Sequence, residues 1–166
     1  SRREVRRVYW AIALREFRTN AGTIDAPIGR HPTIRTRMTV CPEGLGRNAI
    51  THWKVRERFG GLSLVECRLE TGRTHQIRVH LAHERHPVLG DDLYGGSVTV
   101  ALQLVPPRDV ALRNAVRAVN RQMLHARELA FVHPVTGESM HFRCEPPEDF
   151  QQVLAALRDA VAQRGE

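Results

Sequence analysis

Residues 51–96, THWKVRERFGGLSLVECRLETGRTHQIRVHLAHERHPVLGDDLYGG, decide the fold class of this chain. Apolar and polar side chains alternate over residues 51–59 and again over residues 62–69, a period that is typical of β-strands. Gly60 and Gly61 stand between the two runs. We therefore expect these strands to form a hairpin.

A helix is expected after this hairpin. Thr74 has the chemistry of an N-cap, because its hydroxyl can accept a backbone N–H of the next turn, and the apolar positions beyond it predict a helix over residues 75–84. Arg78 falls in the first turn of that helix, where the helix dipole favours anions over cations. A negatively charged group is therefore expected to face Arg78.

Further strands are expected on both sides of this stretch. Residues 8–14, VYWAIAL, have the alternation of a strand that is at least partly covered on both faces. Residues 34–40 also alternate, and such a strand would place Arg35 and Arg37 on one face, which suits an RNA backbone. A second hairpin is expected around the turn at residues 134–137.

Two helices are expected toward the carboxy terminus. Apolar side chains at helical spacing over residues 108–120, after Pro106 and Pro107, predict a surface helix. The final helix should bury the stripe Phe150, Val153, Leu154, Leu157 and Val161. Strands and helices without a regular βαβ rhythm predict an α+β fold, with a mixed, largely antiparallel sheet flanked by helices.

The composition favours one domain with an anionic partner. The 166 residues carry a net charge of +7, and residues 1–60 hold 13 of the 25 basic residues but only 5 of the 18 acidic ones. Because a cationic surface concentrates phosphates, nucleic acid is the expected partner. No apolar run approaches the roughly 20 residues that span a bilayer, and no signal peptide opens the chain, so we expect a cytoplasmic protein without a membrane partner.

The cysteines support the same compartment. Cys41, Cys67 and Cys144 are an odd number at wide spacing, without a CxxC pair. This pattern fits reduced thiols in a cytosolic protein, and we interpret the three side chains as core residues.

Several blocks of the sequence, in order along the chain, resemble one family. They are VYWAIAL at residues 8–14, APIGRHPTIRTRMTV at 26–40, GRNAITHWKV at 46–55, TGRTHQIRVHLAHERHPVLGDDLYGG at 71–96 and RQMLHARELAFVHPVTGE at 121–138. This series is similar to the RluA/RluD-type pseudouridine synthases, which act on large-subunit ribosomal RNA. The resemblance implies a fold like the pseudouridine synthase catalytic domain, and the isomerisation of uridine to pseudouridine without a cofactor.

One element of that family is not found in this sequence. The catalytic aspartate of the family lies in an HRLDxxTSG block, and no aspartate here follows His-Arg-Leu or precedes Thr-Ser-Gly. We therefore expect residues 1–166 to be the carboxy-terminal part of a single catalytic domain, incomplete at its amino terminus and without the family's S4-like RNA-binding domain. The chain alone is expected to be an inactive monomer.

The resemblance also implies roles for three side chains. Arg78 would hold the catalytic carboxylate ionised and oriented, and the alternative is that it pairs with a local acid such as Glu84 or Asp91. Tyr9 would stack on the flipped base or take part in proton transfer, and the alternative is an ordinary core tyrosine. Leu124 is a weaker candidate for the apolar wall of the uracil pocket, and core packing explains the residue nearly as well.

RNA contacts are expected at the start of the motif helix and along the preceding basic segment. The residues are Arg73, Thr74, His75 and Gln76, together with Arg30, His31, Arg35 and Arg37; the alternative is a solvated charged face. Gly90, Asp91 and Tyr94 are expected to shape the loop that supports the site.

Two other functions remain as alternatives. The chain could be an RNA-binding module without catalysis. Less favoured is a metal-dependent hydrolase built on His75, His80, His83 and His86, since histidines three apart on a helix can share zinc. Because there is no HExxH motif and the surroundings are basic, we expect no metal site.

Overall fold

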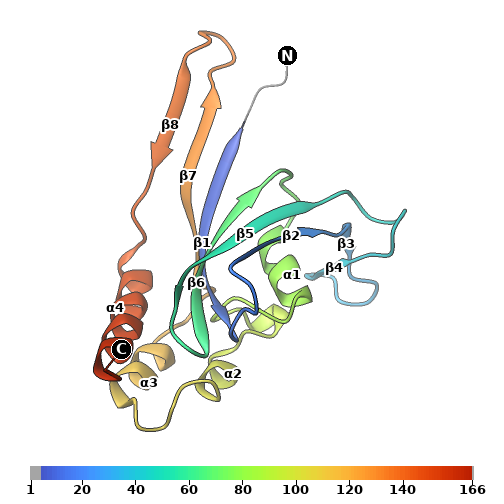
Figure 1. Cartoon of the computed structure of the whole chain (residues 1–166). Helices are drawn as coiled ribbons and strands as arrows, with labels where there is room; N and C mark the ends of the chain where they lie inside the picture. Colours follow the sequence, from blue (N-terminus) through green and yellow to red (C-terminus); the bar gives the residue numbers. More distant parts are fainter. Residues whose placement is uncertain (1–4, 166) are drawn as a thin grey trace.

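The computed structural model describes residues 5–165, in which six strands form one sheet flanked by helices (Figure 1). The strand order is β2-β5-β6-β1-β7-β8, and each neighbouring pair is antiparallel. The bounds are β1 Arg6–Leu14, β2 Ala21–Asp25, β5 Ile50–Arg58, β6 Leu62–Leu69, β7 Leu124–Val132 and β8 Ser139–Arg143. The α+β class, the early strand and both predicted hairpins are confirmed.

A separate pair of strands, β3 (Ile28–Arg30) and β4 (Met38–Val40), forms a second small sheet. The prediction of one strand over residues 34–40 is therefore wrong in its first half, where the chain turns instead. The His31 imidazole accepts the backbone N–H of Ile34 at 3.0 Å, and the Arg37 N–H donates to the Ile34 carbonyl at 3.1 Å. Neither Arg35 nor Arg37 lies on a strand.

The helices are α1 (Gln76–His83), α2 (Val98–Leu102), α3 (Val110–Arg117) and α4 (Glu148–Gln163), with a short 3-10 turn over Asp92–Tyr94. The sequence did not predict α2, and α3 is shorter than expected. α4 buries Phe150, Val153, Leu154, Leu157 and Ala160, whereas Val161 at the end of the predicted stripe is only half-buried.

The sheet separates two hydrophobic cores, and the central strand β1 contributes to both. Ile12 and Leu14 pack with α2, α3 and α4, whereas Ala11 and Ala13 pack with Ile77 and other residues beneath α1. Successive side chains of a strand point to opposite faces. Accordingly α1 covers one face of the sheet and the remaining helices cover the other (Figure 1).

The prediction that Thr74 caps α1 is wrong. The N-cap is His75, which has a left-handed backbone at φ 57° and makes no side-chain capping bond. The turn before the helix is held instead by Gln76, whose side-chain oxygen accepts the Arg73 N–H at 3.0 Å.

The cysteines are not all core residues. Cys67 is fully buried, and burial raises the pKa of its thiol to about 12, whereas Cys144 is exposed and Cys41 is partly exposed. All three thiols are free. Within residues 5–165, no helix has the length and apolarity required to cross a membrane.

Candidate functional site

A paired arginine and aspartate stand at the centre of the motif region. The Arg78 Nε and Nη2 atoms donate to the two carboxylate oxygens of Asp91 at 2.8 and 2.9 Å. The Asp91 side chain is 1% exposed and the Arg78 side chain 13%, so the pair is largely removed from water. Hydrogen bonding to Asp91 is the main cause that raises the pKa of Arg78, against the effect of burial.

This pair identifies the negative group that Arg78 faces among the described residues. It is Asp91, one of the two local acids considered above. A bidentate contact fixes the plane of a guanidinium. The Nη1 atom of Arg78 makes no hydrogen bond with residues 5–165. The Arg78 guanidinium is therefore fixed by Asp91 and still has N–H donors for a second acceptor.

Tyr94 connects the GDDLYGG loop to α1 and β4. The Arg78 guanidinium lies over its ring, 5.0 Å from the centroid. The Tyr94 hydroxyl accepts the Met38 N–H at 2.8 Å and lies 2.7 Å from Nδ1 of His75. Burial, and then the Arg78 charge, lower the pKa of His75, which favours a neutral ring that accepts the hydroxyl proton. Tyr94 and Asp91 thus brace Arg78 from two sides.

Gly90 precedes Asp91 in the loop that contacts Arg78, and its backbone has a φ of +85°. A Cβ at this position would lie 2.1 Å from the Arg121 carbonyl oxygen. Glycine is therefore required both for the backbone conformation and for the close approach to the neighbouring segment.

Tyr9 and Leu124 lie on the sheet face that α1 covers. Both are partly buried and pack against the core that contains Ile77 and Leu81 of α1. Tyr9 is opposite Cys67 on β6, and Leu124 is opposite Ala11 on β1. The structure thus brings both predicted residues beneath the helix that carries Arg78, although no hydrogen bond joins Arg78 to Tyr9 among the described residues.

Part of the predicted RNA-binding set meets in one pocket. Arg30, Arg73 and Thr74 line a cavity of about 390 Å³ between the β3–β4 sheet and the loop before α1. Arg47 lines it too, and no acidic residue does. Arg47 belongs to the block GRNAITHWKV and was not predicted as a site residue. The signal available in the sequence was a Gly-Arg pair at residues 46–47, like the one at residues 72–73.

Gln76, another member of the predicted RNA-binding set, is buried and hydrogen-bonded within the protein. Gln76 is 3% exposed. Its amide donates to the Ile50 carbonyl and the Thr51 hydroxyl, and its oxygen accepts from the Thr71 hydroxyl and the Arg73 N–H. Because every polar atom of this side chain is engaged, we withdraw Gln76 as an RNA contact.

The other four members of the predicted set do not line this pocket. His75 is bonded to Tyr94, and the ring nitrogen of His31 caps its own loop. Arg37 lies 5.4 Å from the centroid of the Tyr94 ring. Arg35 is exposed in the turn before β4.

The histidines that suggested a metal site are engaged separately. The buried His80 ring lies 2.8 Å from the Thr51 hydroxyl and 2.9 Å from the Ala26 carbonyl. His86 stacks on Phe17 with ring centroids 3.7 Å apart. Within residues 5–165, no group of three or more His, Cys, Asp or Glu side chains is arranged to hold a metal ion.

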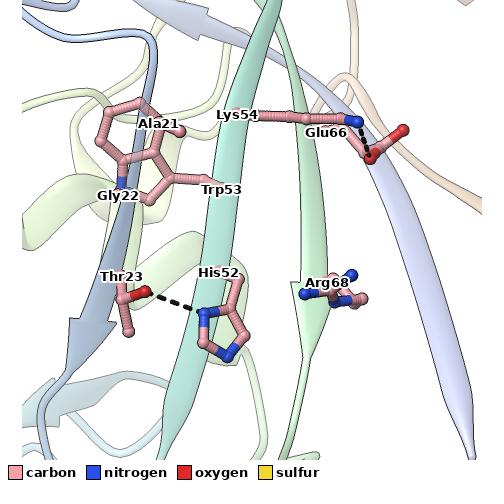
Figure 2. Close-up of a pocket in the computed structure, with 8 residues that line it drawn as sticks. All are labelled: Ala21, Gly22, Thr23, His52, Trp53, Lys54, Glu66 and Arg68. Carbon is pink, nitrogen blue, oxygen red and sulfur yellow. Dashed lines mark hydrogen bonds and ion pairs between the residues drawn. The ribbon is translucent and has the colours of Figure 1, made fainter.

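A second cavity, of about 420 Å³, lies on the opposite face of the sheet (Figure 2). Its lining includes His52, Trp53 and Lys54 of β5, and Glu66 and Arg68 of β6, which are paired with Lys54 and His52 across the two strands. The polar groups of this cavity are largely paired with one another, as in Thr23 with His52 at 2.8 Å and Lys54 with Glu66 at 3.3 Å. None of its lining residues belongs to α1, so the cavity is separate from Arg78.

Comparisons with known proteins agree with the resemblance of the sequence blocks. The family described as RNA pseudouridylate synthase matches residues 1–83. Ribosomal large subunit pseudouridine synthase D of Xanthomonas campestris is 46% identical over 166 residues, which are 100% of this chain and 48% of that protein. The protein of the same name from Escherichia coli is 42% identical over 159 residues, 95% of this chain and 46% of that protein.

A solved structure shares the fold. Human RNA Pseudouridylate Synthase Domain Containing 4 superposes with a TM-score of 0.69 at 28% identity, over 93% of this chain and 62% of that one. The present chain thus spans about half the length of the bacterial relatives and somewhat more of the human structure.

Proposed function

This chain belongs to the RNA pseudouridylate synthase family, and on that premise we propose that it takes part in the isomerisation of uridine to pseudouridine in large-subunit ribosomal RNA in the cytoplasm. The observation that carries the proposal is the braced guanidinium of Arg78. It projects from α1, on the face of the sheet where Tyr9 and Leu124 lie, and it keeps donors beyond its bond to Asp91.

Arg78 acts on the nucleophile in this proposal. The reaction breaks the glycosidic C–N bond of uridine, turns the uracil and joins it again through carbon, and it uses an aspartate carboxylate in this family. A fixed guanidinium within hydrogen-bond reach lowers the pKa of a carboxylate and orients it. Asp91 holds Arg78 ready for that role, because a guanidinium presents five N–H donors and the Asp91 bond uses only two of them.

The nucleophile itself is proposed to come from outside these 166 residues. Asp91 is buried against Arg78, Asp109 pairs with Arg164 at 2.7 Å, and Asp149 pairs with Arg121 at 2.8 Å. The remaining aspartates lie outside any HRLD sequence. Residues 1–166 would then be the carboxy-terminal part of the catalytic domain and would act, as a monomer, only together with the segment that bears the nucleophile.

In this proposal the uracil binds beside Tyr9 and Leu124, the two partly buried residues that pack beneath α1. Tyr9 would stack on the flipped base or move a proton at its carbon, and Leu124 would form an apolar wall. Arg30, Arg47 and Arg73 would hold the RNA backbone at the neighbouring cavity, whose lining contains no acid to compete for these cations.

A tritium-release assay on RNA that contains 5-tritiated uridine tests this function. The protein encoded by the complete reading frame should release tritium, and the chain of residues 1–166 should release none. Turnover by the short chain would show that the nucleophile lies within it. Failure of the long protein to release tritium from any large-subunit ribosomal RNA substrate would refute the proposal.

RNA binding without catalysis is the second candidate, and the acid-free pocket with Arg30, Arg47 and Arg73 favours it for the short chain. A steep fall of RNA affinity with salt would support such binding, because each neutralised phosphate releases counterions. No observation favours a histidine-based metal hydrolase, since His80 and His86 have other partners.

A further inference from the structure

Arg7 is a partly buried arginine to which no role has been given so far. Its Nε atom is inaccessible to solvent and has no hydrogen-bond partner among residues 5–165. Its guanidinium lies against the backbone of Gly72, where a Cβ would stand only 2.3 Å from Nη1. No ion pair joins Arg7 to any residue from 5 to 165. Because Gly72 has no side chain, the Arg7 guanidinium fits against it, and no acidic residue from 5 to 165 pairs with this positive charge.

The position of Arg7 connects it to the proposed pocket. Arg7 and Tyr9 are two residues apart on β1, so both point to the face covered by α1 and stand roughly 7 Å apart along the strand. Gly72 belongs to the lining of the cavity that holds Arg30, Arg47 and Arg73. Arg7 thus lies between the tyrosine and the basic cavity.

We propose that Arg7 binds the RNA phosphate that flanks the target uridine. This inference rests on the proposed function and extends it, because it assigns a phosphate contact next to the residue that meets the base. The buried Nε–H of Arg7 is a donor without an acceptor among residues 5–165, which costs free energy, and an anionic ligand that accepts from it removes that cost. A phosphate oxygen suits the planar guanidinium, which can donate to it through two N–H groups.

The neighbouring Arg6 offers a matched control. It lies one residue away and so points to the opposite face of β1, where its side chain is 57% exposed and stands 3.9 Å from Glu128. Arg6→Gln removes the same charge and nearly the same volume as Arg7→Gln. A phosphate contact specific to the pocket face should therefore separate the two variants.

The experiment uses the full-length protein and an in-vitro transcript of large-subunit ribosomal RNA. Arg7→Gln should weaken RNA binding roughly tenfold, as loss of a charged hydrogen bond predicts. It should also reduce the slope of log affinity against log salt by about 0.9, equivalent to one phosphate. KM should rise while kcat changes little. Arg7→Lys should restore the salt slope but only part of the affinity, because an ammonium group keeps the charge and loses the two-bond contact. Arg6→Gln should stay within about twofold of the wild type.

Thermal unfolding separates a ligand-binding role from a structural one. Because the charge has no described partner, Arg7→Gln should leave Tm unchanged or raise it. A Tm several degrees lower would identify Arg7 as half of a structural pair and would overturn the proposal. So would a fall in kcat with unaltered affinity and salt slope, because the guanidinium would then serve a protein carboxylate.

Affinity and salt slope do not depend on product formation. If the wild-type protein formed no pseudouridine, the proposed function would fail, and the comparison of Arg7→Gln with Arg6→Gln would still decide whether Arg7 contacts phosphate.

Discussion

Replacing Asp91 with asparagine should destabilise the fold, and the size of the loss should show how much burial strengthens the Arg78–Asp91 pair. The change keeps the side-chain shape but leaves a guanidinium that is only 13% exposed without its counter-charge. Removing one partner of a buried pair costs about 3 kcal/mol. In a domain of this size each kcal/mol corresponds to roughly 2–4 °C, so Tm should fall by about 6–12 °C.

The matched control for this prediction is Asp149→Asn. Asp149 makes the same two-bond contact with Arg121, both bonds at 2.8 Å, but the two side chains are 45% and 40% exposed. An exposed pair contributes at most about 1 kcal/mol. Urea titration at pH 7 measures the free energy of unfolding of both variants, provided that their m-values equal that of the wild type. If the two substitutions cost the same free energy, burial does not set the strength of the Arg78–Asp91 pair and our reasoning is refuted.

Two further predictions concern the same helix. In the full-length protein, Arg78→Ala should lower kcat by two or more orders of magnitude and leave RNA affinity nearly unchanged. One cation among many adds little to RNA binding, whereas this one orients the reacting carboxylate. Tritium release measures kcat and filter binding measures affinity, and an active variant would contradict the proposed role. Burial is the main cause that lowers the pKa of His80, so the folded state binds fewer protons than the unfolded chain and stability should be lost as pH falls below about 6.5. Urea midpoints between pH 5 and 7.5 should show a smaller pH dependence in His80→Gln than in the wild type, and equal dependence would locate the titration elsewhere.

The regular parts of this fold were predictable because their patterns are local. Residues 51–69 alternate on both sides of two glycines, and the structure forms β5 and β6 there. Periodicity could not foresee the turn over residues 34–37, because a single imidazole, His31, captures the backbone N–H groups that a strand would have paired. α2 is only five residues long, too short for a helical period to stand out.

The candidate site was predictable in its residue types and less so in its contacts. Arg78 was expected to face an anion, and Asp91 is 13 residues away along the chain, yet the sequence alone did not choose Asp91 over Glu84. Gln76 was misjudged because its surroundings come from β5, whose Ile50 carbonyl and Thr51 hydroxyl enclose the amide. Arg7 escaped notice because an unpaired guanidinium is recognisable only once its neighbours are in place.

The two alanines of β1 have a consequence for how such a protein can change over evolutionary time. Ala11 and Ala13 are fully buried beneath α1, and their strand neighbours Ile12 and Leu14 fill the other core. A larger side chain at either alanine would lift α1 away from the sheet and carry Arg78 with it. Variation that adjusts the choice of RNA target should therefore accumulate in the loops around the pocket, while β1 stays nearly invariant among active homologues.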